Sequence, residues 1–445
     1  MAGGSFTSQN KVRPGVYIRF KTASAQTPTV GERGVAAICE PLSWGPMAQV
    51  MTIEAGADLT QFTGYDATHG KNRFLTEIFK GSNRTNPPKT VLLYRPTATG
   101  AEKAAATSGA LTATAKYPGV RGNDISISVT AVVDEADAFL VSTVVDAQVV
   151  DQQTAKTADT LQSNDWVDFS GTGALTAATG TLLTGGADGK VETAAYSAFL
   201  TNLEPYKFDI LIYDGTDPTV QTAMVSFVKR LAEENGQYSQ LVAAGLPNAD
   251  SRFVINVESG VTLSDGTALS KQQTTWWVGG AQAGALYNQS LTYAAYPGAV
   301  AVSPAMTNNQ YIAALEAGNF VLFAENGQVK VEQDVNTLVT YTPDIGKLYR
   351  KNRIMRLCNT AANDIYNLFS ANYIGIVDNT EVGRSQFKAA IVGYLLDLQG
   401  NSAIQNFSPD DVEVLAGNDT DAIVVNVAIQ AVDSTEKVYL TFEIG

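Results

Sequence analysis

Apolar and polar residues alternate at the end of the sequence, in EKVYLTFEIG (436–445). A period of two is typical of a β-strand with one buried face. The residues of this strand are, in order, Val438, Tyr439, Leu440, Thr441, Phe442, Glu443 and Ile444. Two partners remain open for it: segment 422–432, across the short break at 433–435, or a sheet in a neighbouring subunit.

A second alternating stretch lies near the start, in RPGVYIRF (13–20), directly after the break at Pro14-Gly15. A lone strand is not stable by itself and needs a sheet edge to pair with. We therefore predict that both terminal strands add to sheets of other copies by β-augmentation. The predicted inter-subunit residues are Val16, Tyr17, Ile18, Val438, Tyr439, Leu440, Thr441 and Phe442.

The pattern between the two ends favours a mixed α/β core domain. Apolar runs of strand length occur at 33–42, 89–96 and 207–215, and stripes of period 3.6 predict helices at 72–81 and 218–235. A hairpin is predicted within 319–335, because Asn326-Gly327 accepts the positive φ angles of a tight turn. Close helix packing is the preferred explanation for the glycines of GGAQAG (279–284).

The composition changes near residue 99, where Ala, Thr, Gly, Val and Asp become frequent. Strands are predicted at 123–133 and 138–150, and no long amphipathic helix is evident before 190. The α/β pattern resumes afterwards, so 99–190 reads as a small all-β domain inserted into the core.

Two helices dominate the last hundred residues. The first is predicted within 340–375, with Thr342 as the N-cap and Pro343 at the first helical position. The second is predicted at 383–400 and buries Phe387, Ile391, Tyr394, Leu395 and Leu398. The fold class is therefore α/β and α+β multidomain. The predicted order is an N-terminal arm (1–25), a discontinuous core (26–98 and 191–340), the insertion (99–190), and a C-terminal α+β domain with exchanged terminal strands (341–445).

Charge and composition narrow the function. The net charge of −14 disfavours nucleic-acid binding, which needs a basic face against phosphates. No apolar run approaches the ~20 residues of a membrane span, and the start has no secretory signal pattern. Cys39 and Cys358 lack metal-ligand spacing and are assigned structural roles.

Motifs for catalysis fail. His69 is the sole histidine and lies in a polar stretch, where a surface loop is the preferred interpretation. GGADGK (185–190) misses the P-loop pattern at its first Gly and at its last residue. We predict no catalytic residue, no cofactor and no metal site.

One charged cluster stands out in this acidic chain. Its five cations are Lys347, Arg350, Lys351, Arg353 and Arg356. They lie in the predicted first turns of a helix, where the macrodipole disfavours positive charge. Two interpretations remain open: a solvated face with salt bridges to acids such as Glu332 and Asp334, or a contact surface for an acidic partner.

Several stretches, spread over nearly the whole chain, resemble one family: the contractile tail sheath proteins of bacteriophages and phage-tail-like particles. They are RPGVYIRF, AKYPGVRGNDISISV (115–129), LTGGADG (183–189), EQDVNTLVTYTPDIGKLYRKNRIMRL (332–357) and AVDSTEKVYLTFEI (431–444). The resemblance implies a structural subunit, not an enzyme, that polymerises as a helical array around a tail tube. Contraction of that array drives the tube through a bacterial envelope.

The resemblance also implies partners and place. The partners are other copies in stacked hexameric rings, the tail tube protein, and baseplate and tail terminator proteins, with no nucleic acid and no membrane insertion. Such a protein is assembled in the host cytoplasm and resides in the virion tail sheath. The basic cluster and helix 384–398 are then candidates for the face toward the tube. The first alternative is a non-contractile structural assembly protein. If that protein were a tube subunit, the long helices would argue against it. The second alternative is an enzyme on the α/β core.

Overall fold

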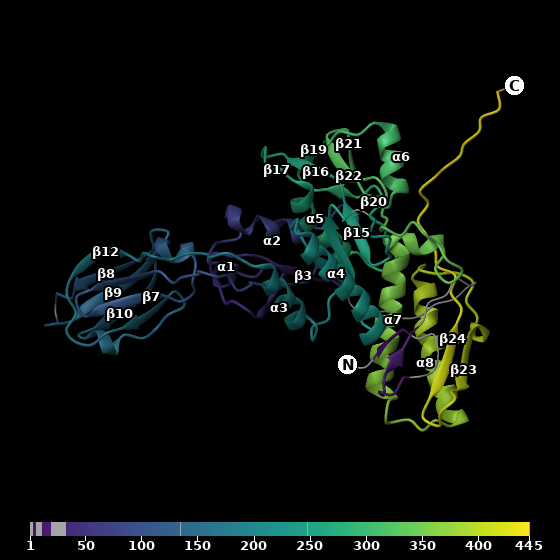
Figure 1. Ribbon diagram of the computed structural model, residues 1–445, viewed down its shortest axis with the longest axis horizontal. Coiled ribbons are helices and arrows are strands. Elements are labelled where there is room, and N and C mark those ends of the chain that lie inside the picture. The colour runs from purple at the N-terminus through teal and green to yellow at the C-terminus, as the bar shows by residue number, and fades with distance from the viewer. Residues whose placement is uncertain (1–2, 6–10, 19–32, 134, 247, 445) are drawn as a thin grey trace. The chain divides into compact units, whose positions relative to one another are not determined.

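The structure is a computed structural model that describes residues 3–5, 11–18, 33–133, 135–246 and 248–444 (Figure 1). The chain divides into two compact units, each described here by itself. The first unit comprises 1–38, 74–92 and 204–445, and the second comprises 39–73 and 93–203. The mixed α/β multidomain class predicted from the sequence is confirmed.

The largest sheet of the first unit contains the strand order β20-β15-β14-β13-β3. The bounds of these strands are β3 (Val35–Cys39), β13 (Ile210–Ile212), β14 (Gln240–Ala244), β15 (Val254–Val257) and β20 (Asn319–Phe320). Two further strands are β4 (Val50–Glu54) and β5 (Thr90–Tyr94). Within the first unit β13 pairs in parallel with β3 and β14, and β15 pairs in parallel with β14 and β20. Every residue of β13, β14 and β15 is buried, as expected for parallel strands covered on both faces.

Helices α4 (Pro218–Arg230) and α5 (Lys271–Gly284) pack on this sheet in the first unit. Ser270 and Gln273 form a capping box at the start of α5. The glycines of α5 let it approach other backbone closely: a Cβ at Gly280 would lie 1.9 Å from the carbonyl oxygen of Ile78. The expected packing role of GGAQAG is therefore confirmed.

Smaller elements complete the first unit. A three-stranded sheet has the order β17-β16-β19, and another has the order β18-β22-β21. Asn326 (φ 52°) and Gly327 (φ 74°) make the tight turn between β21 and β22, so the predicted hairpin is confirmed. The bounds are β16 (Gly260–Leu263), β17 (Ala268–Leu269), β18 (Ala295–Tyr296), β19 (Ala299–Ser303), β21 (Leu322–Glu325), β22 (Gln328–Val331), α2 (Arg73–Ile78), α6 (Asn308–Glu316) and a π-helical turn η4 (Leu231–Asn235).

The second unit contains a sandwich of two antiparallel sheets, β10-β9-β8-β12 and β11-β7-β6. Its strands are β6 (Ala105–Ser108), β7 (Leu111–Ala115), β8 (Ile125–Ala131), β9 (Phe139–Val145), β10 (Gln148–Ala155), β11 (Val167–Ser170) and β12 (Ala178–Leu182). The prediction of one strand over 138–150 is wrong. Asp146 and Ala147 both adopt positive φ and turn the chain into the β9–β10 hairpin.

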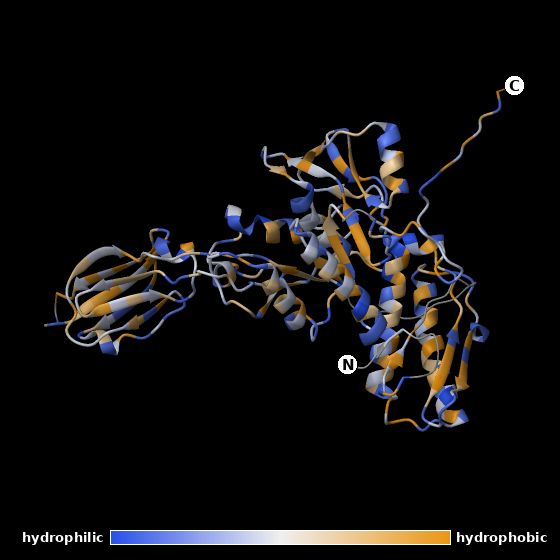
Figure 2. Cartoon of the chain, viewed as in Figure 1, coloured by the Kyte–Doolittle hydropathy of each residue, from blue (hydrophilic) through white to orange (hydrophobic). Residues whose placement is uncertain are grey.

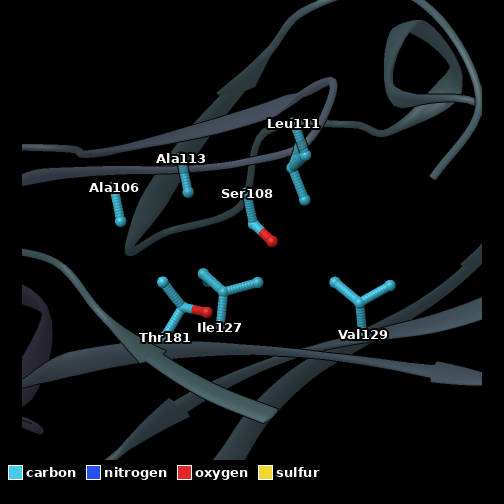
Figure 3. Close-up of a pocket in the computed structure, with 7 residues that line it drawn as sticks. All are labelled: Ala106, Ser108, Leu111, Ala113, Ile127, Val129 and Thr181. Atoms are coloured by element: carbon cyan, nitrogen blue, oxygen red, sulfur yellow. The ribbon is translucent and has the colours of Figure 1, made fainter. Parts of the chain in front are cut away.

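The space between the two sheets is filled by their own side chains. Ile127, Val129 and Val167 belong to one apolar cluster there. Figure 3 shows the side chains of Leu111 and Ile127 pointing toward each other across the remaining gap. That gap has a volume of about 10 Å³, barely the space that one water needs, so it is too small to hold a ligand.

Arg121 fastens the sandwich to the rest of the second unit. Its side chain is 3% exposed, and its guanidinium pairs bidentately with Asp146 at 2.9 and 2.6 Å. It also donates to the carbonyl of Gly64 and lies 4.3 Å from the ring centre of Tyr65. His69 stacks on the same Tyr65 ring and is exposed, which confirms the surface-loop interpretation. The other elements of this unit are α1 (Thr60–Thr63), α3 (Thr193–Leu203), η1 (Gly70–Asn72), η2 (Val120–Asp124) and η3 (Ala158–Thr160).

The C-terminal region of the first unit consists of α7 (Asn352–Asn372), α8 (Glu381–Gly400) and the antiparallel hairpin of β23 (Val412–Ala416) and β24 (Ile423–Val427). Short 3₁₀ turns η5 (Lys347–Arg350) and η6 (Pro409–Asp411) precede α7 and β23. All five predicted core residues of α8 are buried, and Phe387, Ile391 and Leu395 pack against the hairpin.

The predicted start of the first C-terminal helix at Thr342 and Pro343 is wrong. Lys351 is extended (φ −82°, ψ 123°) and bridges to Val335, and the N–H of Asn352 donates to the carbonyl of Asp334. These contacts with residues 334–335 keep Lys351 extended, so α7 begins only at Asn352, after the 3₁₀ turn η5.

Candidate assembly surfaces

Residues 437–444, named here the C-terminal arm, form no strand with their own chain. Figure 1 shows the arm as an extended trace that ends at the label C. Val438 is 80% exposed, Leu440 70% and Phe442 79%. The alternative hairpin between 422–432 and the last strand does not form in this structure, because residues 437–444 belong to no strand and β24 pairs with β23 alone among the described residues. Pairing of the arm with another copy stays a prediction.

The predicted N-terminal strand has a partner within its own chain. β2 (Val16–Tyr17) pairs in parallel with β1 (Gly3–Gly4), and the N–H of Ile18 donates to Gly4. The hydroxyl of Tyr238 donates to the Ile18 carbonyl at 3.2 Å. The description of this stretch as a lone strand is therefore wrong, although the paired part is only two residues long. Arg19 and Phe20 lie outside the described residues.

The β23–β24 hairpin has two outer edges, and within the described residues neither carries another strand. Figure 2 shows β24 largely in the hydrophobic colour. Val425 and Val427 pack on the α7–α8 core but remain partly exposed. A two-stranded sheet is marginally stable alone, and its unpaired N–H and C=O groups form a template for further strands.

The five predicted partner-facing cations do not share one environment. Lys347 is exposed, whereas Arg350, Lys351 and Arg353 are half-buried. A pocket of about 130 Å³ lies among them. Its lining residues are Gln333, Val335, Lys347, Arg350, Lys351 and Lys437.

Arg356 was predicted to face a partner, and this is wrong. Its side chain is 0% exposed and forms a 2.7 Å ion pair with Asp334. The guanidinium also donates to the side chain of Gln282 on α5 and to the carbonyl of Gln289. Arg356 thus joins α7 to α5. The alternative interpretation was right about the salt bridge to Asp334 but wrong about a solvated face at Arg356, because both side chains are buried.

Asp334 is fully engaged. Its carboxylate accepts from Gln282, Asn352 and the N–H of Leu291, at 2.7, 2.9 and 3.0 Å. Burial by itself would raise the pKa of Asp334, but the charge of Arg356 and these hydrogen bonds outweigh burial and lower it. The carboxylate is therefore ionised at neutral pH inside the protein.

A half-buried carboxylate, Glu436, was not predicted from the sequence. It accepts hydrogen bonds from Thr292 (2.8 Å) and Gln333 (2.6 Å) and forms an ion pair with Lys351. Burial would raise its pKa, yet Lys351 and Gln333 lower the pKa below its ordinary value. We name these four residues the Glu436 cluster. No local sequence signal marks it, because its members come from four separate segments.

Within the described residues, no three His, Cys, Asp or Glu side chains are grouped so that they could hold a metal ion. Among the described helices, none has the length and apolar character of a membrane span. Cys39 and Cys358 are both buried and unbonded to each other, and burial raises the pKa of the Cys358 thiol to about 12.

Comparison with known proteins assigns the chain. Family models match three successive parts of it: the phage tail sheath protein beta-sandwich domain (98–188), the central domain (189–337) and the C-terminal domain (344–445). The chain belongs to the phage tail sheath protein family. The β-sandwich domain model matches an internal part of the chain, which confirms the predicted inserted all-β domain.

Relatives agree with the assignment. The chain is 33% identical to the phage-like element PBSX protein XkdK of Bacillus subtilis, over 100% of both sequences. A crystal structure of a sheath tail protein from Desulfitobacterium hafniense is 41% identical, with a TM-score of 0.85 over 96% of this chain and 99% of that one. The contracted helical sheath of the anti-feeding prophage shares the fold, at 15% identity and a TM-score of 0.58 over 97% and 99% of the chains.

Proposed function

We propose that this sheath protein polymerises as a helical array of stacked hexameric rings around a tail tube, and that contraction of the array drives the tube through a bacterial envelope. One observation carries the assembly step: an exposed arm of alternating apolar and polar residues, on a chain whose C-terminal sheet has open edges within the described residues. Strand addition between copies would give hydrogen-bond partners to the backbone of the arm and to the backbone of the open sheet edge, because the N–H and C=O groups of each can pair with those of the other.

In this proposal the C-terminal arm, and residues Val16–Ile18 at the other end, add strands beside β23 or β24 of neighbouring copies. Heterologous contacts of this kind build rings or helical filaments, since each copy donates one surface and accepts on another. Terminal segments that are hydrogen-bonded to a neighbouring subunit would keep the subunits linked while the packing of their folded parts changes. The contracted sheath of the anti-feeding prophage, which shares this fold, supports the contractile assignment.

The test of strand addition is truncation. We expect the full chain to form rings or sheaths by sedimentation and negative-stain electron microscopy, and a chain ending at Lys437 to remain unassembled. The matched control replaces Glu443 with Gln and keeps every apolar residue of the arm. Equal assembly of truncated and full-length chains would contradict the proposal.

The basic cluster is proposed to face an acidic partner, with the tail tube as that partner. Arg356 is excluded by its burial, and Lys351 is engaged by Glu436, which leaves Lys347, Arg350 and Arg353. Helix α8, whose outer side exposes Val382 and Leu396, is the other candidate for the tube-facing element.

Charge reversal tests this contact. Lys347→Glu with Arg350→Glu should weaken sheath formation on purified tubes about tenfold, which corresponds to ~1.4 kcal/mol. Assembly without tubes should be unchanged. The control carries the same charge change at Lys156 and Lys190, exposed cations of the second unit. Equal effects of the two double variants would refute a specific tube contact.

The remaining parts of the proposal concern context. The partners at the two ends of the array are proposed to be baseplate and tail terminator proteins, and assembly is proposed to take place in the bacterial host cytoplasm. The role is structural, without catalysis. Electron micrographs of complete particles in long, narrow and short, wide forms would support contraction, and sheaths of one fixed length would favour a non-contractile assembly protein.

A further inference from the structure

The exposure of the chain changes abruptly just after Glu436. The side chain of Glu436 is 10% exposed, and Val438, two positions later, is 80% exposed. Before this point the N–H of Val432 donates to the carbonyl of Ala403, and Asp433 lies 3.4 Å from Lys351. After it, the described residues of the arm belong to no strand.

Three separate segments converge on the Glu436 carboxylate. Thr292 follows α5, Gln333 follows β22, and Lys351 immediately precedes α7. Each supplies a donor or charge to one of the two carboxylate oxygens. A half-buried carboxylate with three partners has a defined position, because every alternative position loses charge-assisted hydrogen bonds.

The Glu436 cluster is also tied to the interior. The Thr292 hydroxyl that donates to Glu436 accepts a hydrogen bond from the N–H of Asp334 at 3.0 Å. Asp334 in turn holds Arg356. The point at which the arm begins is therefore fixed to the buried ion pair between α7 and the rest of the first unit.

We propose that Glu436 is a positioning residue that sets where, and in what direction, the C-terminal arm leaves each subunit toward its neighbour. The inference rests on the proposed strand addition and deepens it. An added strand must arrive in register, because a slip of one residue turns its apolar face outward. A fixed start limits the reach of the arm's eight residues to about 26 Å at ~3.3 Å per residue.

The first experiment measures amide hydrogen exchange of the unassembled protein. In the wild type, residues 432–436 should exchange more slowly than residues 438–444. In Glu436→Gln, which keeps the shape and removes the charge, this difference should shrink while the melting temperature stays within about 3 °C. Equal exchange on both sides of Glu436 in the wild type would overturn the proposal.

The second experiment measures assembly by sedimentation and electron microscopy. Glu436→Gln should raise the protein concentration for half-maximal assembly about tenfold. Glu443→Gln, the same substitution in the free part of the arm, should assemble as the wild type does. The double variant Lys351→Glu with Glu436→Lys restores opposite charges and should assemble better than Glu436→Lys alone. A rescue of assembly between variants of equal melting temperature would not follow from a role in folding alone.

The outcomes separate this inference from the proposed function. If the chain ending at Lys437 fails to assemble but Glu436→Gln assembles like Glu443→Gln, the positioning role is wrong and strand addition stands. If the chain ending at Lys437 assembles normally, strand addition fails and the positioning role fails with it. Should Glu436→Gln prove unfolded, Gln333→Met removes one donor from the cluster at similar size and takes its place in both experiments.

Discussion

The inserted sandwich and the C-terminal region both use antiparallel strands, but only the sandwich completes its own sheets. The sandwich pairs sheets of four and three strands over a closed apolar core. The C-terminal region has one hairpin, half-buried on α8, and an exposed strand-like arm that its own chain does not pair. The sandwich pairs all of its strands within the insertion, as expected for an inserted domain. The C-terminal region instead has a two-stranded sheet and an arm without a strand partner.

The largest effect on stability is expected at the buried ion pair between Arg356 of α7 and Asp334. Arg356→Met removes the cation and leaves Asp334 buried and unpaired, which should lower the free energy of unfolding by about 3–5 kcal/mol. Urea denaturation of the unassembled protein measures it. Lys347→Met, an exposed cation nearby, is the control and should change stability by under about 0.5 kcal/mol. Similar losses of stability in both variants would show that the buried ion pair contributes no more to stability than an exposed cation does.

A core truncation in the sandwich should be costly locally and harmless to assembly. Ile127 is 4% exposed between the sheets, so Ile127→Ala should destabilise the sandwich by about 2–5 kcal/mol through lost burial and a cavity. The protein should still form sheaths under conditions in which it is folded, as electron microscopy would show. Loss of assembly by the folded variant would mean that the sandwich also completes contacts between copies.

Acid should loosen the C-terminal region through Asp334. Its pKa in the folded protein is lowered below the unfolded value of about 3.9, so its stabilising contribution is present above that value. The contribution is lost as pH falls through the folded pKa. The difference in unfolding free energy between wild type and Asp334→Asn should therefore narrow below about pH 4. A difference that stays constant down to pH 2 would contradict the assignment.

The smallest effect on stability is expected in the arm. Phe442 is 79% exposed, so Phe442→Ala should change the unfolding free energy of the unassembled chain by under about 0.5 kcal/mol. Assembly should weaken, because the ring belongs to the face that a strand addition would bury. A stability loss comparable to that of Ile127→Ala would show that the arm packs on its own subunit in solution.

Patterns within one element were predictable from the sequence. The α8 stripe followed from the period of 3.6, and the β21–β22 turn followed from the special φ preferences of Asn-Gly. Both depend on neighbours a few residues apart. The β9–β10 hairpin was missed because Asp146-Ala147 is a weak turn signal between two apolar runs.

Features that depend on distant segments were not predictable in the same way. Thr342 and Pro343 form a good local helix start, but contacts of Lys351 and Asn352 with 334–335 delay the helix. The burial of Arg356 had a usable signal: Asn352, Arg356 and Asn359 recur at helical spacing and form a polar stripe on the buried side of α7. The Glu436 cluster had none, since four segments meet only in the folded chain.

A free arm and an open sheet edge on the same subunit give an array a direction. If every copy donates its arm to the next, one end of the array presents arms without acceptors and the other presents edges without donors. The two ends are then chemically different surfaces, and no single protein can close both by the same contact. Growth could start from one end alone, with the length decided by whatever first occupies the other.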